Sequence, residues 1–244
     1  MVKKRSSIII VSLIVLLAAV LIMFYAVVIA KPSYAKIYQS VARQVVEVKA
    51  ETGENIISYG SAVLINSDGY FISNAHVVTY TQMATQIEFE RYYIRFSFED
   101  EYREVDLIAY DNDVDMSILK LKSMPDYKLK PIKIAKTDKL KVGNEVLAVG
   151  NGMNHGIGLT YGHISLARVN IEYDERMHNV IQCDLIINEG NSGGALVSNK
   201  GKLLGLTTFR VKDSKGNPIY GIAFCIPSED VMNYLDTNGI NWVS

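Results

Sequence analysis

The segment from Asn188 to Leu196 carries the residue type best suited to covalent chemistry, because its one serine, Ser192, lies between glycines at the end of an apolar run. A serine hydroxyl attacks a carbonyl efficiently only when a base takes its proton and fixed donors stabilise the resulting oxyanion. Flanking glycines allow the sharp turn that would direct N–H groups at one point. Similar clusters of Gly, Asn and Ser also form plain turns, so the interpretation depends on partner residues.

Two other segments contain the partners that such a serine needs. Apolar runs on either side of a turn at 66–69 predict a β-hairpin, and His76 falls where its second strand ends. Asp115 is the last acid before another apolar strand, so it can be partly buried and still reach an imidazole. The three residues follow in the order His, Asp, Ser, which is the chymotrypsin order among serine hydrolases.

Five motifs occur in a fixed order along the chain. They are the glycine-rich hairpin before the histidine, the ending Asn74-Ala75-His76-Val77-Val78, the acid before a strand, the loop Gly190-Asn191-Ser192-Gly193-Gly194-Ala195-Leu196, and Gly221-Ile222-Ala223-Phe224-Cys225-Ile226-Pro227-Ser228. Together they make the chain resemble a trypsin-like serine protease of the HtrA/Deg type. The resemblance covers most of the region from about Val41 to Leu235.

The resemblance implies a catalytic triad of His76, Asp115 and Ser192. His76 would accept and return the proton of Ser192, while Asp115 would orient the imidazole and stabilise its charged form. The amides of Gly190 and Ser192, with help from Asn191, would form the oxyanion hole. Neutral Asn191 stands where digestive trypsins carry an aspartate that pairs with a new amino terminus, so activation by that ion pair is not expected.

The resemblance also places Ile186, Thr207 and Phe209 at the primary specificity pocket. Ile186 lies six residues before the nucleophile, where trypsin-like enzymes have the base of this pocket. No acid occupies that position, so we expect cleavage after small or medium aliphatic residues. The alternative is that the isoleucines of this run only fill a core.

Short strand-like runs separated by Gly, Asn and Asp recur from Val45 to Ile226, and one of the longest is Val180 to Ile187. This spacing favours an all-β barrel or sandwich fold over alternating strands and helices. The resemblance selects two six-stranded antiparallel β-barrels, at about 41–125 and 131–244, with the active site between them. Ser228 is expected to cap a short C-terminal helix.

The N-terminal segment predicts where this domain is located. Residues 8–30 carry no charge, and as a helix they would span about 35 Å, enough for a bilayer core. The basic residues among 1–7 place that end in the cytoplasm, so the protease domain at 41–244 would be extracytoplasmic. A tether at 31–40 would follow this single-pass anchor. A cleaved signal peptide is the alternative, although its apolar region is typically shorter.

Composition adds limits on partners and cofactors. The net charge of −1 gives no electrostatic reason to expect nucleic-acid binding. His155, His163 and His178 lack metal-ligand spacing, so we expect neither a metal nor a cofactor. Cys183 and Cys225 lie in apolar runs and are expected to be buried thiols, although an extracytoplasmic location would permit a disulfide.

Three functions remain open on the sequence. The first is a membrane-anchored serine endopeptidase that cleaves extracytoplasmic proteins, in protein quality control or regulated proteolysis. The second is a catalytically silent protease-fold protein that binds peptides or proteins. The third is a secreted soluble protease, with a mature amino terminus near Lys36. The resemblance further suggests a homotrimer formed through about Tyr34 to Val45. The chain stops at Ser244, so we expect no PDZ domain in cis.

Overall fold

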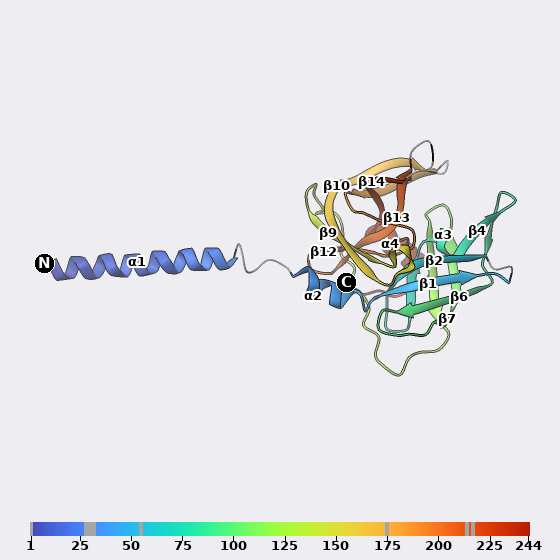
Figure 1. The fold of residues 1–244 in the computed structure, drawn as a ribbon, viewed down its shortest axis with the longest axis horizontal. Helices are drawn as coiled ribbons and strands as arrows, with labels where there is room; N and C mark the ends of the chain where they lie inside the picture. Colours follow the sequence, from blue (N-terminus) through green and yellow to red (C-terminus); the bar gives the residue numbers. More distant parts are fainter. Residues whose placement is uncertain (1, 27–32, 54–55, 174–175, 213–214, 216–217) are drawn as a thin grey trace. The chain divides into compact units, whose positions relative to one another are not determined.

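The computed structural model describes residues 2–26, 33–53, 56–173, 176–212, 215 and 218–244. Contacts divide the chain into two compact units, residues 1–34 and Ala35–Ser244. Each unit is described by itself below, and both are drawn in Figure 1.

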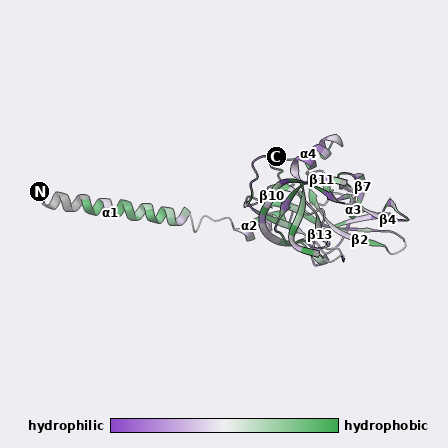
Figure 2. Ribbon diagram, turned by 90° about the horizontal axis from the view of Figure 1, so that it is seen from above, coloured by the Kyte–Doolittle hydropathy of each residue, from purple (hydrophilic) through white to green (hydrophobic). Residues whose placement is uncertain are grey.

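The first unit contains one long helix, α1 (Val2–Phe24). Apolar residues occupy most of it, as the hydropathy colours of Figure 2 show. The large apolar side chains between Ile9 and Tyr25 are exposed. In the part of the chain that the structure describes, no helix meets the combined length and hydropathy needed to cross a bilayer. The predicted segment 8–30 extends into residues 27–30, outside the described residues, and the membrane span stays a prediction.

The second unit contains two closed antiparallel barrels, as the resemblance implied. Around the first barrel the strands are, in spatial order, β1 (Val45–Glu51), β2 (Ile57–Leu64), β3 (Tyr70–Ser73), β8 (Met116–Leu121), β7 (Arg103–Asp111) and β6 (Arg91–Phe96). Around the second they are β10 (Gly158–Tyr173), β11 (Arg176–Cys183), β14 (Pro218–Pro227), β13 (Leu203–Lys212), β12 (Ala195–Ser198) and β9 (Glu145–Gly150).

Alternating side chains build the core of each barrel. In β6, Tyr92, Ile94 and Phe96 are buried while the residues between them are more exposed, which is the period of two that a half-buried strand requires. Ile94 and Phe96 join a core that fills the first barrel. A separate core that includes Ile164 and Leu196 fills the second. Each barrel therefore closes on its own apolar interior, and polar residues are left for the surface where the two meet.

The free cysteines are buried in that second core, Cys183 on β11 and Cys225 on β14. Register pairs Cys183 with Ala223 and Ile181 with Cys225, so the two thiols are diagonal neighbours across the strand pair. A hydrogen bond with Cys183, together with burial, raises the pKa of the Cys225 thiol well above its usual value. The expectation of buried thiols is confirmed.

Several local predictions were wrong in detail. His76 lies in a short helix, α3 (Ala75–Val78), and not at a strand end. The predicted tether at 31–40 stays a prediction; it overlaps α2 (Tyr34–Val41), whose Tyr38 hydroxyl donates a hydrogen bond to the Ile157 carbonyl at 2.6 Å. β11 ends at Cys183, so the last four residues of the run to Ile187 are not in a strand.

Two smaller elements complete the unit. A two-stranded sheet of β4 (Thr79–Gln82) and β5 (Thr85–Glu88) follows α3, and no pattern in the sequence predicted it. The expected C-terminal helix is α4 (Ser228–Thr237). Ser228 does not cap it, because Pro227 holds the cap position and the Ser228 hydroxyl donates to the Ala135 carbonyl at 2.5 Å.

Candidate active site

Strand pairing brings His76 and Asp115 together. β3 and β8 run antiparallel with Ser73 opposite Ser117, so the residues just after β3 and just before β8 emerge at the same edge of the first barrel. His76 is in the turn of helix that follows β3, and Asp115 immediately precedes β8. Their separation of 39 residues along the chain is therefore closed by a single strand pair.

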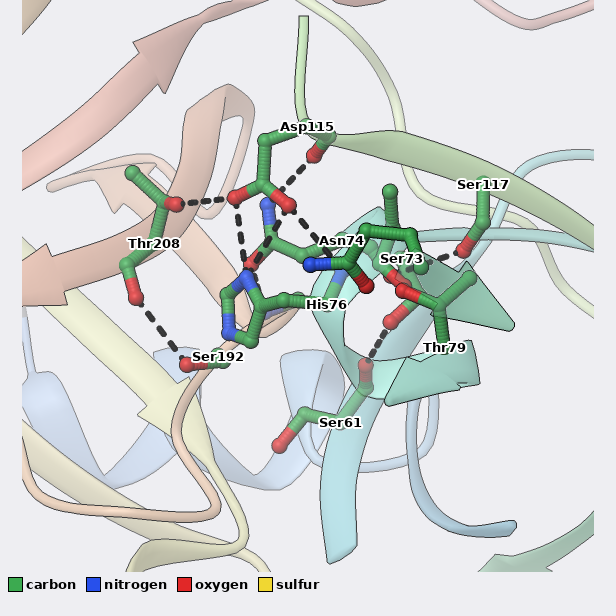
Figure 3. A network of polar contacts seen from close by, with 12 residues as sticks. Ser61, Ser73, Asn74, His76, Thr79, Asp115, Ser117, Ser192 and Thr208 are labelled. Carbon is green, nitrogen blue, oxygen red and sulfur yellow. Dashed lines mark hydrogen bonds and ion pairs between the residues drawn. The ribbon is translucent and has the colours of Figure 1, made fainter. Parts of the chain in front are cut away.

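The two side chains form a well-ordered pair (Figure 3). The Nδ1 atom of His76 lies 2.9 Å and 3.0 Å from the two carboxylate oxygens of Asp115. The backbone N–H of His76 also donates to Asp115 Oδ1 at 3.1 Å. Thr208 Oγ1 donates to the other oxygen at 2.6 Å. Three donors thus fix the carboxylate, and the carboxylate fixes Nδ1 of the ring, which leaves Nε2 available to act on a substrate.

Electrostatics favour the charged form of each member of the pair. Burial alone would lower the pKa of His76, but the charge and hydrogen bond of Asp115 outweigh it and raise this pKa above its usual 6.5. Burial alone would raise the pKa of Asp115, and here the His76 charge, followed by the His76 and Thr208 hydrogen bonds, lowers it below 3.8. Asp115 therefore stays ionised wherever the site could work near neutral pH.

Ser192 reaches the same site from the second barrel. Its hydroxyl donates to the main-chain carbonyl of Thr208 at 2.9 Å, as Figure 3 shows. Within the described residues, Ser192 makes no hydrogen bond to His76. Thr208 therefore links the two halves of the site, since its side chain holds Asp115 and its carbonyl holds Ser192. A rotation of the Ser192 side chain toward the imidazole would be needed before proton transfer, and such bonds often tighten only with substrate bound.

The two backbone amides predicted for the oxyanion hole have fixed orientations. A trans peptide directs its C=O and N–H to opposite sides. The carbonyl of Glu189 accepts from Met153 N at 2.7 Å, which turns the Gly190 N–H the other way. The carbonyl of Asn191 accepts from Gly194 N at 2.9 Å and from the Thr207 hydroxyl, which does the same for the Ser192 N–H.

Both of these amides remain available for a ligand. Among the described residues, neither the Gly190 N–H nor the Ser192 N–H donates to a protein acceptor. Gly190 has a φ of +90°, a conformation that suits glycine. The Asn191 side chain packs near Gly150 and Gly152. Two free, fixed donors beside a serine hydroxyl are what stabilisation of a tetrahedral oxyanion requires.

The three residues expected at the specificity pocket lie in different environments. Ile186 is 52 % exposed, whereas Thr207 is buried and holds the nucleophile loop through its hydroxyl. Phe209 packs edge-on against His178, with ring centroids 5.6 Å apart, and belongs to a small apolar cluster with Phe224. The pocket itself stays a prediction.

Sequence reasoning missed the polar residues around the predicted triad. Thr208 lay within a predicted apolar strand, and Asn74 was noted only as part of the motif before His76. Ser61, at 0 % exposure, donates its hydroxyl to the Gly190 carbonyl at 2.7 Å and its N–H to the Ser192 carbonyl at 2.8 Å. No signal in residue type or spacing separates these side chains from ordinary turn or strand residues. The described part of the chain contains no cluster of three His, Cys, Asp or Glu side chains that could hold a metal.

Comparison with known proteins agrees with this geometry. The domain family described as "Trypsin-like peptidase domain" matches residues 60–206, which is more than half of the chain. The chain belongs to the trypsin-like peptidase family. The match begins in β2 of the first barrel and ends in β13 of the second, so it includes all three predicted triad residues.

Relatives of this trypsin-like peptidase are HtrA-type proteases. It is 40 % identical over 184 residues to the "Probable serine protease do-like" of Buchnera aphidicola subsp. Acyrthosiphon pisum, covering 74 % of this chain and 35 % of that protein. It is 35 % identical over 182 residues to the "Periplasmic serine endoprotease DegP" of Escherichia coli K12, with the same coverage. The chain spans about a third of the length of these relatives.

Solved structures give the same result for the fold. The chain matches the structure titled "HtrA-type protease AlgW with tripeptide" with a TM-score of 0.71 and 28 % identity, over 86 % of this chain and 65 % of that one. A serine-to-alanine variant of the same protease, also with tripeptide, gives a TM-score of 0.72 at 27 % identity, over 84 % and 63 %.

Proposed function

We propose that this chain is a serine endopeptidase in which His76, Asp115 and Ser192 act as a catalytic triad. The observation that carries the proposal is the arrangement around Thr208, which holds the Asp115 carboxylate with its side chain and the Ser192 hydroxyl with its carbonyl. A histidine oriented by a buried carboxylate, beside a serine whose loop offers two free amides, suits acyl transfer better than any other reaction class.

The mechanism follows from these positions. Ser192 Oγ would attack the scissile carbonyl carbon while its proton passes to His76 Nε2, and the amides of Gly190 and Ser192 would receive the negative oxygen. The C–N bond then breaks as His76 returns the proton to the leaving amine, which leaves an acyl-enzyme. Water, deprotonated by His76, would attack the ester and release Ser192.

Substrates and cellular location are proposed from the relatives and the sequence. The similar DegP protein is named a periplasmic endoprotease, so we propose extracytoplasmic proteins as substrates, in quality control or regulated proteolysis. We also propose cleavage after small or medium aliphatic residues, because Ile186 stands at the position expected for the base of the specificity pocket. The run of uncharged residues 8–30 would anchor the chain in the membrane, and exposed apolar side chains along α1 support this role. Assembly into a homotrimer through residues 34–45 belongs to the same proposal.

Cleavage of casein by the purified full-length chain tests the proposed activity. Ser192→Ala and His76→Ala are each expected to reduce cleavage by at least about a thousandfold, because the residues of a triad act as a unit. Ser123→Ala, which changes an exposed serine outside the site, serves as the matched control. Cleavage that survives in Ser192→Ala, with circular dichroism unchanged, would show that another residue is the nucleophile.

A catalytically silent binding protein is the second candidate, and one observation favours it. Ser192 donates to the Thr208 carbonyl and not to His76. If that rotamer persists when substrate binds, the imidazole cannot take the proton. The casein experiment separates the two, since a silent protein would bind casein without cleaving it.

A further inference from the structure

Asn74 is a fully buried polar residue, at 0 % exposure, whose side chain connects both halves of the proposed site. Its Nδ2 atom donates to the main-chain carbonyl of Asp115 at 2.9 Å. Its Oδ1 atom accepts from the backbone N–H of Gly193 at 2.6 Å. These partners are 41 and 119 residues away in sequence; the first is the proposed triad acid itself, and the second directly follows the proposed nucleophile.

The location of Asn74 argues against an ordinary helix-capping role. Asn74 is at the N-cap of α3, where asparagine commonly accepts a hydrogen bond from the first turn. Its side chain makes no such capping bond. The capping position is used instead for contacts with two distant loops, one from each barrel. Figure 3 shows the side chain directed toward Asp115.

Only an amide satisfies both partners at this position. The Asp115 carbonyl needs a donor and the Gly193 N–H needs an acceptor, and a carboxamide offers one of each on a planar group. A carboxylate would place two acceptors there. An alkyl side chain would remove the donor to the Asp115 carbonyl and leave the Gly193 N–H with the Thr207 carbonyl as its acceptor. The main chain of Asn74 is held as well, because Ser117 Oγ donates to its carbonyl at 2.9 Å.

Both partners of Asn74 have a positive φ, and at Asp115 this conformation needs support. Asp115 is a non-glycine residue with a φ of +52°, and Gly193 has a φ of +78°. Left-handed geometry costs an L-residue about 1–2 kcal/mol, so the Asp115 turn persists only because its surroundings hold it. The Gly193 N–H also donates to the Thr207 carbonyl at 2.9 Å. Thr207 belongs to the second barrel, so it is the Asn74 contact that joins this loop to Asp115 of the first barrel.

We propose that Asn74 is a positioning residue that sets the separation between the His76–Asp115 pair and the Ser192 loop. This role rests on the proposed protease function. Asn74 would not contact substrate, and it would act through the placement of the acid and the nucleophile. Misplacement of catalytic groups by about 1 Å can cost about a hundredfold in rate. Its loss should therefore reduce the chemical step and leave substrate binding unchanged.

The test measures labelling of the full-length chain by a fluorophosphonate, with the limiting rate and the half-saturating concentration determined separately. Asn74→Ala is expected to lower the limiting rate about a hundredfold at an unchanged half-saturating concentration. Asn66→Ala is the matched control. Asn66 is also buried, and at the opposite end of β3 its side chain joins its own turn to a distant segment, accepting from Asp68 N at 3.0 Å and donating to Asn241 O at 2.9 Å. Asn66→Ala should lower the free energy of unfolding about as much as Asn74→Ala and leave the labelling rate unchanged.

Asn74→Asp decides the matter if Asn74→Ala does not fold. It is nearly isosteric and keeps the acceptor for Gly193 N–H, but it loses the donor to the Asp115 carbonyl. Its limiting rate is expected to fall at least about tenfold, the equivalent of one lost hydrogen bond to a strained group. Wild-type rates in folded Asn74→Ala or Asn74→Asp would overturn the role, and so would equal losses in Asn74→Ala and Asn66→Ala. A wild-type chain that resists labelling would instead overturn the protease function itself.

Discussion

Thr208 contacts both Asp115 and Ser192. It uses its side-chain oxygen for the first and its main-chain oxygen for the second. The side-chain hydroxyl holds Asp115 Oδ2 at 2.6 Å, and the main-chain carbonyl accepts from Ser192 Oγ at 2.9 Å. Only the first contact depends on residue type. Thr208 can therefore be changed so that the support of the acid is removed while the serine contact is kept.

Thr208→Val is expected to lower kcat/KM about tenfold, because a hydrogen bond to a charged group contributes about 1.5–3 kcal/mol. Without this donor the carboxylate is less stabilised, so the pKa of Asp115 should rise. Thr208→Ser retains the hydroxyl and should restore most of the activity. Casein cleavage by wild type, Thr208→Val and Thr208→Ser measures this effect. Equal rates for Thr208→Val and wild type would show that the hydrogen bond to Asp115 does not contribute to activity.

The pH dependence of the site follows from the His76–Asp115 pair. His76 must be neutral to accept a proton, and Asp115 raises the pKa of His76 above 6.5. Activity should therefore fall with decreasing pH through a midpoint above 6.5. Asp115→Asn removes the cause of that increase and leaves burial, which lowers the pKa. The midpoint should then move below 6.5, with a loss of about 10⁴ in kcat.

Measuring the labelling rate from about pH 5 to 9 covers the titration of a histidine and checks this expectation. The direction of the midpoint shift is the informative result, because a merely unfolded variant would lose its rate without moving the midpoint. A midpoint that stays in place in a folded Asp115→Asn protein would separate Asp115 from the titration of His76.

The sequence offered candidates at this scale where chemistry restricts residue type. A hydrolase of this order needs an imidazole, a carboxylate and a hydroxyl, and each stood in a short, recognisable motif. Asn74 and Thr208 could not be assigned in the same way. Their roles depend on backbone carbonyls and amides brought close by folding, and these groups are present in every residue of the chain.

At the scale of elements, the loop between β11 and β12 is shaped by contacts from the first barrel. Ser61 on β2 bonds the carbonyls of Gly190 and Ser192, and Asn74 at the end of β3 bonds the Gly193 amide. The loop that carries Ser192, the proposed nucleophile, therefore depends on two strands of the other barrel for its conformation. Close approach of these backbones leaves no room for added side-chain atoms.

Gly193→Ala is expected to destabilise the loop and abolish labelling. A Cβ atom there would lie 2.1 Å from the Ser61 carbonyl oxygen and 2.3 Å from Ser73 Oγ, in addition to the cost of a φ of +78°. Together these effects should lower the free energy of unfolding by about 2–4 kcal/mol. Urea denaturation and labelling measure the two effects.

Gly143→Ala provides the matched comparison for this prediction. Gly143 has a similar φ of +83°, yet nothing lies within 4 Å of an added Cβ. It should therefore lose only about 1 kcal/mol and keep full labelling. Equal behaviour of the two alanine variants would mean that the contacts around Gly193 do not constrain the nucleophile loop.

Predictions of elements succeeded for the barrel strands and failed for the two short helices before and after the first strands. The barrel strands follow from alternation, because burial of one face fixes a period of two. α3 has four residues, too few to show a helical period. The eight residues of α2 do show one, because Tyr34, Ile37, Tyr38 and Val41 are its less exposed residues, but the segment was predicted only as a tether. In the run to Ile187, the part after Cys183 buries Leu185 and Ile187 without pairing as a strand.

At the scale of the whole molecule, every contact of the candidate site lies within the unit Ala35–Ser244. The site needs both barrels, since the first supplies His76, Asp115 and the supporting Ser61 and Asn74, while the second supplies Ser192 and Thr208. The resemblance predicted this division correctly, because the double barrel is a property of the family. The role of the N-terminal unit could not be derived in the same way.

Deletion of residues 1–32 is expected to leave the labelling rate within about twofold of the full-length rate, since changes at independent sites usually add and the residues of the candidate site belong to the unit Ala35–Ser244. The proposed anchor predicts that the full-length chain floats with lipid vesicles and the shortened chain does not, as expected when about 20 apolar residues are removed. Flotation of both proteins, or of neither, would contradict the anchor without affecting the assignment of the site.

The central claim is that Ser192 is the nucleophile and His76 its base. Mass spectrometry of the full-length chain after fluorophosphonate treatment at neutral pH tests it most directly. The account predicts a single phosphonyl adduct on Ser192, present in wild type and absent from His76→Ala. An adduct on another serine, no adduct in folded wild type, or an undiminished Ser192 adduct in His76→Ala would contradict it.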